Sequence, residues 1–217
     1  TAGVESSFLI QVRDQFENVV IADDSDQQPP FIITIVRVSP QILNDAIRHE
    51  PSGISSSHQV SAYIKGYQDS AFVASYSSTL TGTYSLSIVL HSYNAVNRSS
   101  IYVHANSMSI DTSLYSSSRK SIVAGSELSQ MVVYARDRYG NNHTSGGINL
   151  TVTHSMPGFV VGHMSMIDMS DGSYVWTSNL TISGQHLVTL THNFVPLLPG
   201  PMTFRVIPGQ ISSWSSS

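Results

Sequence analysis

The sequence predicts an all-β protein built from two tandem β-sandwich domains, and three observations support this prediction. Short runs of β-branched and aromatic residues alternate with polar residues, which is the period of a half-buried strand. No stretch keeps the 3.6-residue period of an amphipathic helix over any length. Two sequence motifs occur twice in the same order, so the chain contains two copies of one fold.

The first repeated motif lies at the start of each copy. Residues 2–18 read AGVESSFLIQVRDQFEN, and residues 124–141 read AGSELSQMVVYARDRYGN. Both contain Ala-Gly-x-Glu, an alternating apolar run, and then Arg-Asp-x-aromatic-x-Asn. An Asp side chain can accept hydrogen bonds from the backbone amides that follow it. We therefore expect Asp14 and Asp137 to form turns and not to take part in catalysis.

The second repeated motif fixes the domain boundaries. It pairs Asp69, Phe72, Gly82 and Leu86 with Asp171, Tyr174, Gly184 and Val188. The offset is about 123 residues in the first motif and about 102 in the second, so the first copy carries about 20 extra residues. Their Ser, Gly and Pro content predicts a loop at residues 41–59. The predicted domains are residues 1–107 and 108–209, followed by a strand-like tail at residues 210–217.

Alternating runs predict the strands of both sandwiches. Asp171-Gly172 stands between two such runs and predicts a hairpin turn. Roughly seven short strands per hundred residues, separated by turn residues, are typical of a β-sandwich. The clearest runs are residues 7–14, 31–38, 71–78 and 83–92 in the first copy, and 129–137, 148–155, 172–179 and 186–193 in the second.

Three short motifs of the second copy carry a family resemblance. They are Asp171-Gly172-Ser173-Tyr174, Ser183-Gly184-Gln185-His186 and Pro199-Gly200-Pro201-Met202, downstream of Ala124-Gly125. Through them the chain resembles tandem filamin-type immunoglobulin-like repeats. The first copy departs from the pattern, because Ser70 stands in place of the turn glycine and NRSSIYV replaces LPGPMTFRV. The resemblance implies two tandem immunoglobulin-like (filamin-type) β-sandwich domains.

Composition and motifs argue against several function classes. Only 11 % of residues are charged and the net charge is −4, so we expect neither nucleic acid nor an anionic membrane as a partner. No apolar run reaches 18 residues, so we expect no membrane insertion. The absence of cysteine excludes disulfides and Cys-type zinc sites. Nucleophile-elbow, phosphate-loop and metalloprotease motifs are missing, so we expect no enzyme and no cofactor.

Two groups of residues raise the question of a metal site. His186 and His192 are six residues apart on a predicted strand and so share a face, which His154 or His163 could join. Three carboxylates, Asp23, Asp24 and Asp26, cluster in one loop and could supply oxygen ligands. No carboxylate lies at a spacing from these histidines that is typical of metal ligands. Polar strand-face histidines and a solvated acidic loop are therefore the favoured interpretations, and no metal site is predicted.

Sequons and composition favour an extracellular or cell-surface protein. Ser and Thr provide the polar surface that charged residues usually provide. We expect Asn97 and Asn142 to be exposed at turns, whereas Asn149, at a strand start, could be blocked. Covalent N-glycans are expected at the four Asn-x-Ser/Thr sites, Asn97, Asn142, Asn149 and Asn179.

The chain ends suggest how copies could join. Filamin-type repeats begin with a long first strand; about fifteen residues supply it before Ala124, but only Thr1 stands before Ala2. We expect an uncovered sheet edge in the first domain, a template for another strand. The tail QISSWSSS follows the second domain as SMSIDTSLYSSS follows the first. The predicted assembly interface is Ile211 and Trp214 of one copy against Thr1, Ala2 and Gly3 of another.

Three functions remain open at this point. The leading hypothesis is a non-enzymatic extracellular structural protein, a glycosylated subunit of a fibre or surface appendage that assembles head to tail by strand addition. Equally, the tail could belong to adjacent repeats of a longer chain. The first alternative is a cell-surface adhesion or ligand-binding module whose partner adds to a sheet edge near residues 31–38 in the first domain, and near residues 148–153 with 160–167 in the second. The second alternative is a cytosolic filamin-like scaffold.

Overall fold

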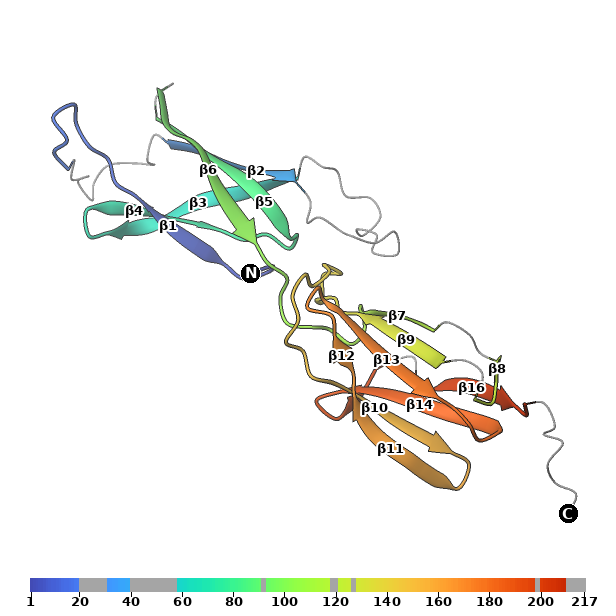
Figure 1. The fold of residues 1–217 in the computed structure, drawn as a ribbon. Coiled ribbons are helices and arrows are strands. Elements are labelled where there is room, and N and C mark those ends of the chain that lie inside the picture. The colour runs from blue at the N-terminus through green and yellow to red at the C-terminus, as the bar shows by residue number, and fades with distance from the viewer. Residues whose placement is uncertain are drawn as a thin grey trace, which may run out of the picture. The chain divides into compact units, whose positions relative to one another are not determined.

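A computed structural model describes residues 1–19, 31–39, 58–90, 93–117, 121–125, 128–197 and 200–209 (Figure 1). The chain divides into two compact units, Thr1–Asn106 and Ser107–Ser217, one residue before the predicted boundary. All regular elements of the described residues are strands. Within these residues, no helix has the length and apolar character needed to cross a membrane. The predicted tail and all but two residues of the predicted loop 41–59 lie outside the described residues.

Unit 1 is a sandwich whose two layers share one strand. The sheet order is β1-β4-β3-β2-β5-β6. The start of β3 pairs with β2 and its remainder pairs with β4, with a register shift between Ile64 and Gly66. β3 therefore joins the layer β1-β4-β3 to the layer β2-β5-β6. The strands are β1 (Ser6–Ile10), β2 (Phe31–Ser39), β3 (Gln59–Gln68), β4 (Ala71–Tyr76), β5 (Gly82–Leu90) and β6 (Tyr93–Val103).

Unit 2 has the same plan with its two layers separated. One sheet has the order β11-β10-β14-β16-β8, with β15 also paired to β14, and the other has the order β12-β13-β9-β7. Two strands, β11 and β12, stand where unit 1 has the continuous β3. The strands are β7 (Leu114–Ser117), β8 (Ser121–Val123), β9 (Leu128–Tyr134), β10 (Leu150–Met156), β11 (Phe159–Ser165), β12 (Ile167–Asp168), β13 (Ser173–Asn179), β14 (Gly184–His192), β15 (Val195–Pro196) and β16 (Met202–Ile207).

The strand register is identical in the two units. Ile10 faces Phe72 in the β1–β4 pair, and Val133 faces Tyr174 in the β9–β13 pair. Likewise Gly82 faces Val103, and Gly184 faces Val206. A register shift of one residue would turn every side chain to the other face, so this agreement equates the units residue by residue. The paired residues of these strands in unit 1 thus have defined counterparts in unit 2.

The repeated Arg-Asp-x-aromatic-x-Asn motif forms the same turn in both units. Asp14 Oδ1 accepts hydrogen bonds from the backbone N–H groups of Phe16 and Asn18 at 2.8 and 2.9 Å. Asp137 Oδ1 accepts the corresponding bonds from Tyr139 and Asn141 at 2.9 and 3.0 Å. The prediction that both Asp residues form turns is confirmed.

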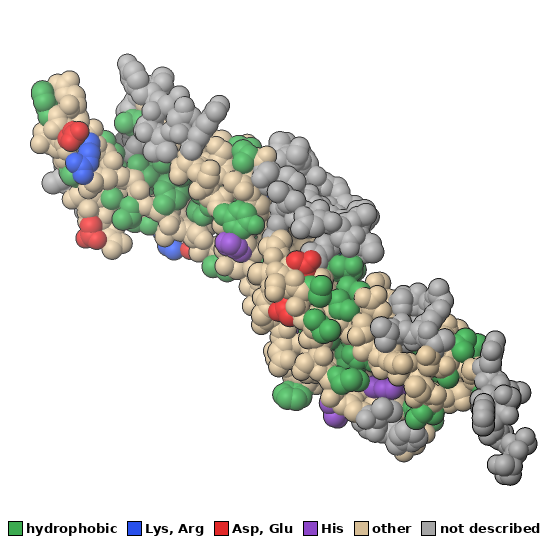
Figure 2. Space-filling model, viewed as in Figure 1, with side chains coloured by type: hydrophobic (Ala, Val, Ile, Leu, Met, Phe, Trp, Pro, Cys, Tyr) green, Lys and Arg blue, Asp and Glu red, His purple; other side chains and the backbone are tan. Residues whose placement is uncertain are grey.

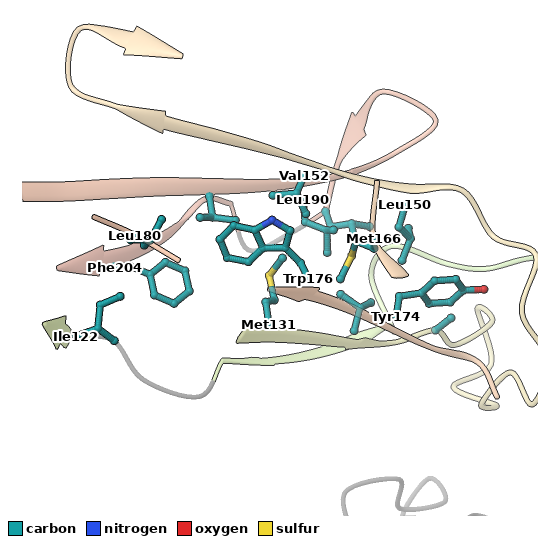
Figure 3. Close-up of a cluster of buried hydrophobic side chains, with 14 of the residues drawn as sticks. Ile122, Met131, Leu150, Val152, Met166, Tyr174, Trp176, Leu180, Leu190 and Phe204 are labelled. Carbon is teal, nitrogen blue, oxygen red and sulfur yellow. The ribbon is translucent and has the colours of Figure 1, made fainter. Parts of the chain in front are cut away.

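The core of unit 2 lies between its two sheets (Figure 3). Trp176 projects from β13 and Phe204 from β16, and their ring centroids lie 6.2 Å apart. Met131 and Val133 of β9 are also buried there. Because β9 and β13 belong to one sheet and β16 to the other, these contacts are the packing expected of a sandwich.

Candidate functional site

The Ala-Gly motif closes the end of each unit. Ala2 N–H donates to His104 O at 2.8 Å, and Gly3 N–H donates to Ser78 O at 2.6 Å. Ala124 and Gly125 donate to the matching carbonyls of Ile207 and Leu180. Ala2 is fully buried. Its placement in an intermolecular interface was therefore wrong, because both motif amides and the Ala2 side chain are already used within unit 1.

In unit 2 a segment before the Ala-Gly motif covers the edge of the sheet. We call residues 107–117 the cover segment. Its strand β7 pairs antiparallel with β9, so that Tyr115 faces Val133 and Ser116 faces Val132. β9 consequently has a partner on each side, β13 and β7.

The cover segment also encloses the Asp137 turn. Ser109 N–H donates to Arg136 O at 2.7 Å, and Thr112 Oγ1 donates to Asp137 O at 2.6 Å. Ser113 Oγ accepts from Arg136 N–H at 3.0 Å. Asp137 is buried as a result. Two of these three hydrogen bonds thus involve a hydroxyl side chain, that of Thr112 or that of Ser113.

The matching surface of unit 1 is open. Within the described residues β1 pairs with β4 alone. On this edge Leu9 is 61 % exposed, and in the turn Phe16 is 73 % exposed. Asp14 is exposed, although its counterpart Asp137 is buried. We call β1 together with the turn at residues 13–18 the open edge.

A second sheet edge of unit 1 likewise lacks, among the described residues, the strand that covers its counterpart in unit 2. In unit 2, β8 runs parallel to β16, pairing Ile122 with Val206, and the Ile122 side chain is buried in the core. No described strand pairs with the outer edge of β6, the counterpart of β16. Tyr102, the counterpart of Arg205 on that strand, is exposed. Among the described residues, therefore, no strand of unit 1 occupies either of the two positions that β7 and β8 fill in unit 2.

A polar groove of about 360 Å³ lies over β1 and β3. Glu5, just before β1, accepts a hydrogen bond from the Tyr63 hydroxyl and pairs with Lys65 Nζ at 3.0 Å. These two bonds, first that of Tyr63, hold the pKa of Glu5 below its ordinary value. Figure 2 shows few charged side chains on the visible face of the chain. The exposed charged side chains of the open edge, Arg13, Asp14 and Glu17, all lie in its turn, whereas β1 itself carries none.

The histidines do not group as the sequence suggested. His186 meets His154, with Nδ1 and Nε2 2.7 Å apart, and both side chains are buried. His192 instead lies near Asn149 O at the other end of β14, and His163 bonds Thr153 Oγ1. No three His, Cys, Asp or Glu side chains of the described residues could hold a metal ion together. The acidic loop with Asp23, Asp24 and Asp26 lies outside the described residues.

The sequons differ in accessibility. Asn149 and Asn179 are exposed. Asn142 is only 5 % exposed and its Oδ1 accepts a hydrogen bond from Arg136 Nε at 2.8 Å, so the expectation of an exposed Asn142 was wrong. The reason is that its turn lies under the cover segment. The side chain of Asn97, and the tail with Ile211 and Trp214, lie outside the description.

The edges predicted for a bound peptide are only partly edges. β2, at the predicted 31–38 site, pairs with β3 and β5, so this prediction was wrong. β10, at the 148–153 site, also has two partners. β11, at the 160–167 site, pairs only with β10 among the described residues and is an edge strand. Sequence patterns identify strands but do not tell which strands lie in the middle of a sheet and which lie at its edge.

Comparison with solved structures supports the fold. FdeC, an Escherichia coli adhesin, matches with a TM-score of 0.62 and 21 % identity over 98 % of this chain and 61 % of its own. InvD of Yersinia pseudotuberculosis matches with a TM-score of 0.59 and 15 % identity over 100 % of this chain and 56 % of its own. The chain thus spans less than two thirds of either protein chain. No protein-family profile and no curated protein matches the sequence.

At these identities the likeness shows the fold alone. It covers both units, and each unit has the two-layered strand order of an immunoglobulin-like sandwich. The resemblance read from the repeated motifs is therefore confirmed at the level of the fold: the chain folds as two tandem immunoglobulin-like β-sandwich domains.

Proposed function

We propose that the chain is a non-enzymatic, surface-displayed structural module of the adhesin type that joins neighbouring immunoglobulin-like units by strand addition. The observation that carries this proposal is the open edge of unit 1, whose counterpart in unit 2 is occupied by the cover segment. An edge strand offers a row of backbone donors and acceptors to an added strand. The similarity of the fold to that of FdeC, an adhesin, supports the surface setting.

The proposed occupant of the open edge is the tail of a second copy. In the sequence, Trp214 precedes three serines as Tyr115 does in the cover segment, and Tyr115 faces Val133, the counterpart of Ile10. Hydroxyl groups in the tail match the polar contacts that Thr112 and Ser113 make. Because tail and edge are different surfaces, repetition of the contact builds a filament and not a closed dimer.

Cysteine cross-linking tests this register directly, because the chain has no cysteine of its own. Leu9 corresponds to Val132, which faces Ser116, and Ser215 follows Trp214 as Ser116 follows Tyr115. The pair Leu9→Cys and Ser215→Cys should therefore come within disulfide distance between copies. We expect a ladder of covalent oligomers on a non-reducing gel after mild oxidation.

A matched control separates register from chance collision. Val36 on β2 is half-buried and already has a partner on each side, Gln59 of β3 and Ser85 of β5. Val36→Cys combined with Ser215→Cys should give no ladder. An equal ladder from both pairs, or none from the first pair, would overturn head-to-tail strand addition. Filaments in electron micrographs of the unmodified chain, lost on deletion of residues 210–217, are the independent readout.

Surface display has its own test. Among the sequons whose side chains are described, Asn149 and Asn179 are exposed and can carry N-glycans without unfolding, whereas Asn142 is buried. We expect glycopeptides containing Asn149 or Asn179, and none containing Asn142, in mass spectra of material from the native source. Glycan-free protein confined to the cytosol would favour a cytosolic scaffold instead.

A ligand-binding role is the second candidate, and the edge strand β11 favours it. A surface partner could add a strand there without using the open edge of unit 1. In that case a monomeric chain would bind its partner, and proline substitutions in β11 would abolish binding while the Leu9–Ser215 cross-link never forms.

A further inference from the structure

We infer that the buried His154–His186 pair makes unit 2 a pH-sensitive element, which loosens in mildly acidic surroundings while unit 1 keeps its structure. The pair sits on the inner face of one sheet, His154 on β10 and His186 on β14. The exposed fractions of the two side chains are 3 % and 2 %. This inference does not depend on strand addition.

The hydrogen bonds of the pair fix one neutral arrangement. His186 Nε2 lies 2.7 Å from Ile182 O, and because a carbonyl only accepts, this nitrogen carries a proton. In a neutral ring His186 Nδ1 is then an acceptor, and it receives the Nε2–H of His154 at 2.7 Å. A further proton on His186 Nδ1 would set two donors against each other. A further proton on His154 would leave a cation in the core.

Among the residues that the structure describes, no carboxylate lies beside the pair to balance an added proton. A pocket of about 320 Å³ beside the pair is lined by Met156, Met164, Asn179 and Ile182 but by no carboxylate. Of the ionisable side chains on neighbouring strands, His163 on β11 bonds Thr153, and Arg205 on β16 is exposed beside the inward Phe204. Asp168 on β12 accepts from the N–H groups of Gly147 and Ser170. Facing the pair, β13 contributes Trp176, whose ring centroid lies 6.3 Å from that of His154.

Unit 1 provides the internal comparison. By register, Tyr84 is the counterpart of His186, and Ile35 is the counterpart of His154. The Tyr84 hydroxyl donates to Leu80 O at 2.9 Å, the same contact that His186 makes with Ile182 O. Ile35 and Tyr84 are fully buried and do not titrate between pH 5 and 7.

The sign of the effect follows from burial. Loss of water contact, and then the neighbouring His186, lower the pKa of His154 in the folded state. Since the unfolded chain takes up a proton near pH 6.5, the stability of unit 2 is complete above that pH and is lost as the pH falls below it. One extra proton bound by the unfolded state raises the unfolding constant about tenfold per pH unit.

The test is amide hydrogen exchange of the full chain between pH 7.5 and 5.0, corrected for intrinsic exchange rates. Peptides from the β10 and β14 core should lose protection below pH 6.5, by up to tenfold per pH unit for one proton, while β2 and β5 peptides stay constant. Replacing the pair by its unit 1 counterparts, His154→Ile with His186→Tyr, should remove the dependence. His163→Gln, which alters an exposed histidine, should leave it unchanged.

Two results would overturn the inference. One is equal pH dependence of protection in the two units of the unsubstituted chain. The other is a double variant that folds and still loses protection below pH 6.5. If the double variant does not fold, the exchange data on the unsubstituted chain and on His163→Gln decide the matter alone.

Discussion

The two units share one register and one set of turns, but they differ in what covers the first strand. Asp14 and Asp137 accept the same backbone hydrogen bonds, yet Asp137 is buried under the cover segment and Asp14 is exposed. The turn geometry is therefore local, set by the motif itself. Its burial is decided by a segment that lies outside the motif.

The cores differ as well. Trp176 of unit 2 stands at the position of Ala74 in unit 1, and the histidine pair stands at the positions of Ile35 and Tyr84. A large aromatic side chain and a titratable pair thus distinguish unit 2. The following predictions use these differences, and each compares the two units within one chain.

The largest effect should come from Trp176. Trp176→Ala gives unit 2 the residue that unit 1 has at this position, Ala74. The side chains around Trp176 are packed for an indole ring, so the substitution leaves a cavity. We expect a loss of about 3 to 5 kcal/mol in the stability of unit 2. Urea denaturation followed by hydrogen exchange would show the loss in unit 2 peptides only. A loss below about 1 kcal/mol would mean that the interior of unit 2 collapses around the smaller side chain.

The Asp turns should respond unequally. Asp137→Ala leaves the buried N–H groups of Tyr139 and Asn141 without their acceptor, which should cost unit 2 about 3 kcal/mol. Asp14→Ala should cost unit 1 less, because water can solvate the same groups in the exposed turn. Equal losses in denaturation of the two variants would show that the cover segment does not exclude water from the turn.

Relieving backbone strain in the turn of unit 1 should give a smaller effect, and one that raises stability instead of lowering it. Glu17 has φ = 66° where its counterpart Gly140 has φ = 82°, a region that costs a residue with a side chain about 1 to 2 kcal/mol. Glu17→Gly should therefore raise the stability of unit 1 by about 1 kcal/mol, and Gly140→Ala should lower that of unit 2 by a similar amount. Gly66→Ala is the control, since no positive φ and no close neighbour opposes a methyl group there. Thermal melting would rank the three variants.

The smallest effect should be the acid response of unit 1. Bonds from Tyr63 and Lys65 lower the pKa of Glu5, and bonds from Asn18 lower that of Asp14. Their contributions are present above the ordinary carboxyl pKa of about 4 and are lost as the pH falls through the lowered values. Unit 1 should therefore weaken slightly below pH 4, well after unit 2. Melting curves of Glu5→Gln should show a reduced response.

Much of this arrangement could be predicted from the residues. The repeated motifs predicted two sandwiches, and Ser70, expected in place of a turn glycine, does adopt φ = 64° like a glycine there. The sequence named His154 and His163 as residues that could join the face of His186 and His192, but it could not decide which histidine His186 contacts. Strand periodicity places His186 and His192 on one face, but six residues along a strand separate them by about 20 Å. The register of β10 against β14 decides which histidine His186 meets.

Asn142 shows the same limit. Its sequon follows a turn, and turns are usually exposed. The cover segment, which begins about thirty residues earlier in the chain, packs over that turn and buries it.

By itself the sequence determined the duplication, the strand class and the Asp turns, because strand periodicity and turns depend on residues close together in the chain. Only the tertiary structure decided which edges stay open, which sequons are accessible and that two histidines share one buried site. These features depend on pairing between segments far apart in sequence, and backbone pairing leaves little trace in side-chain patterns.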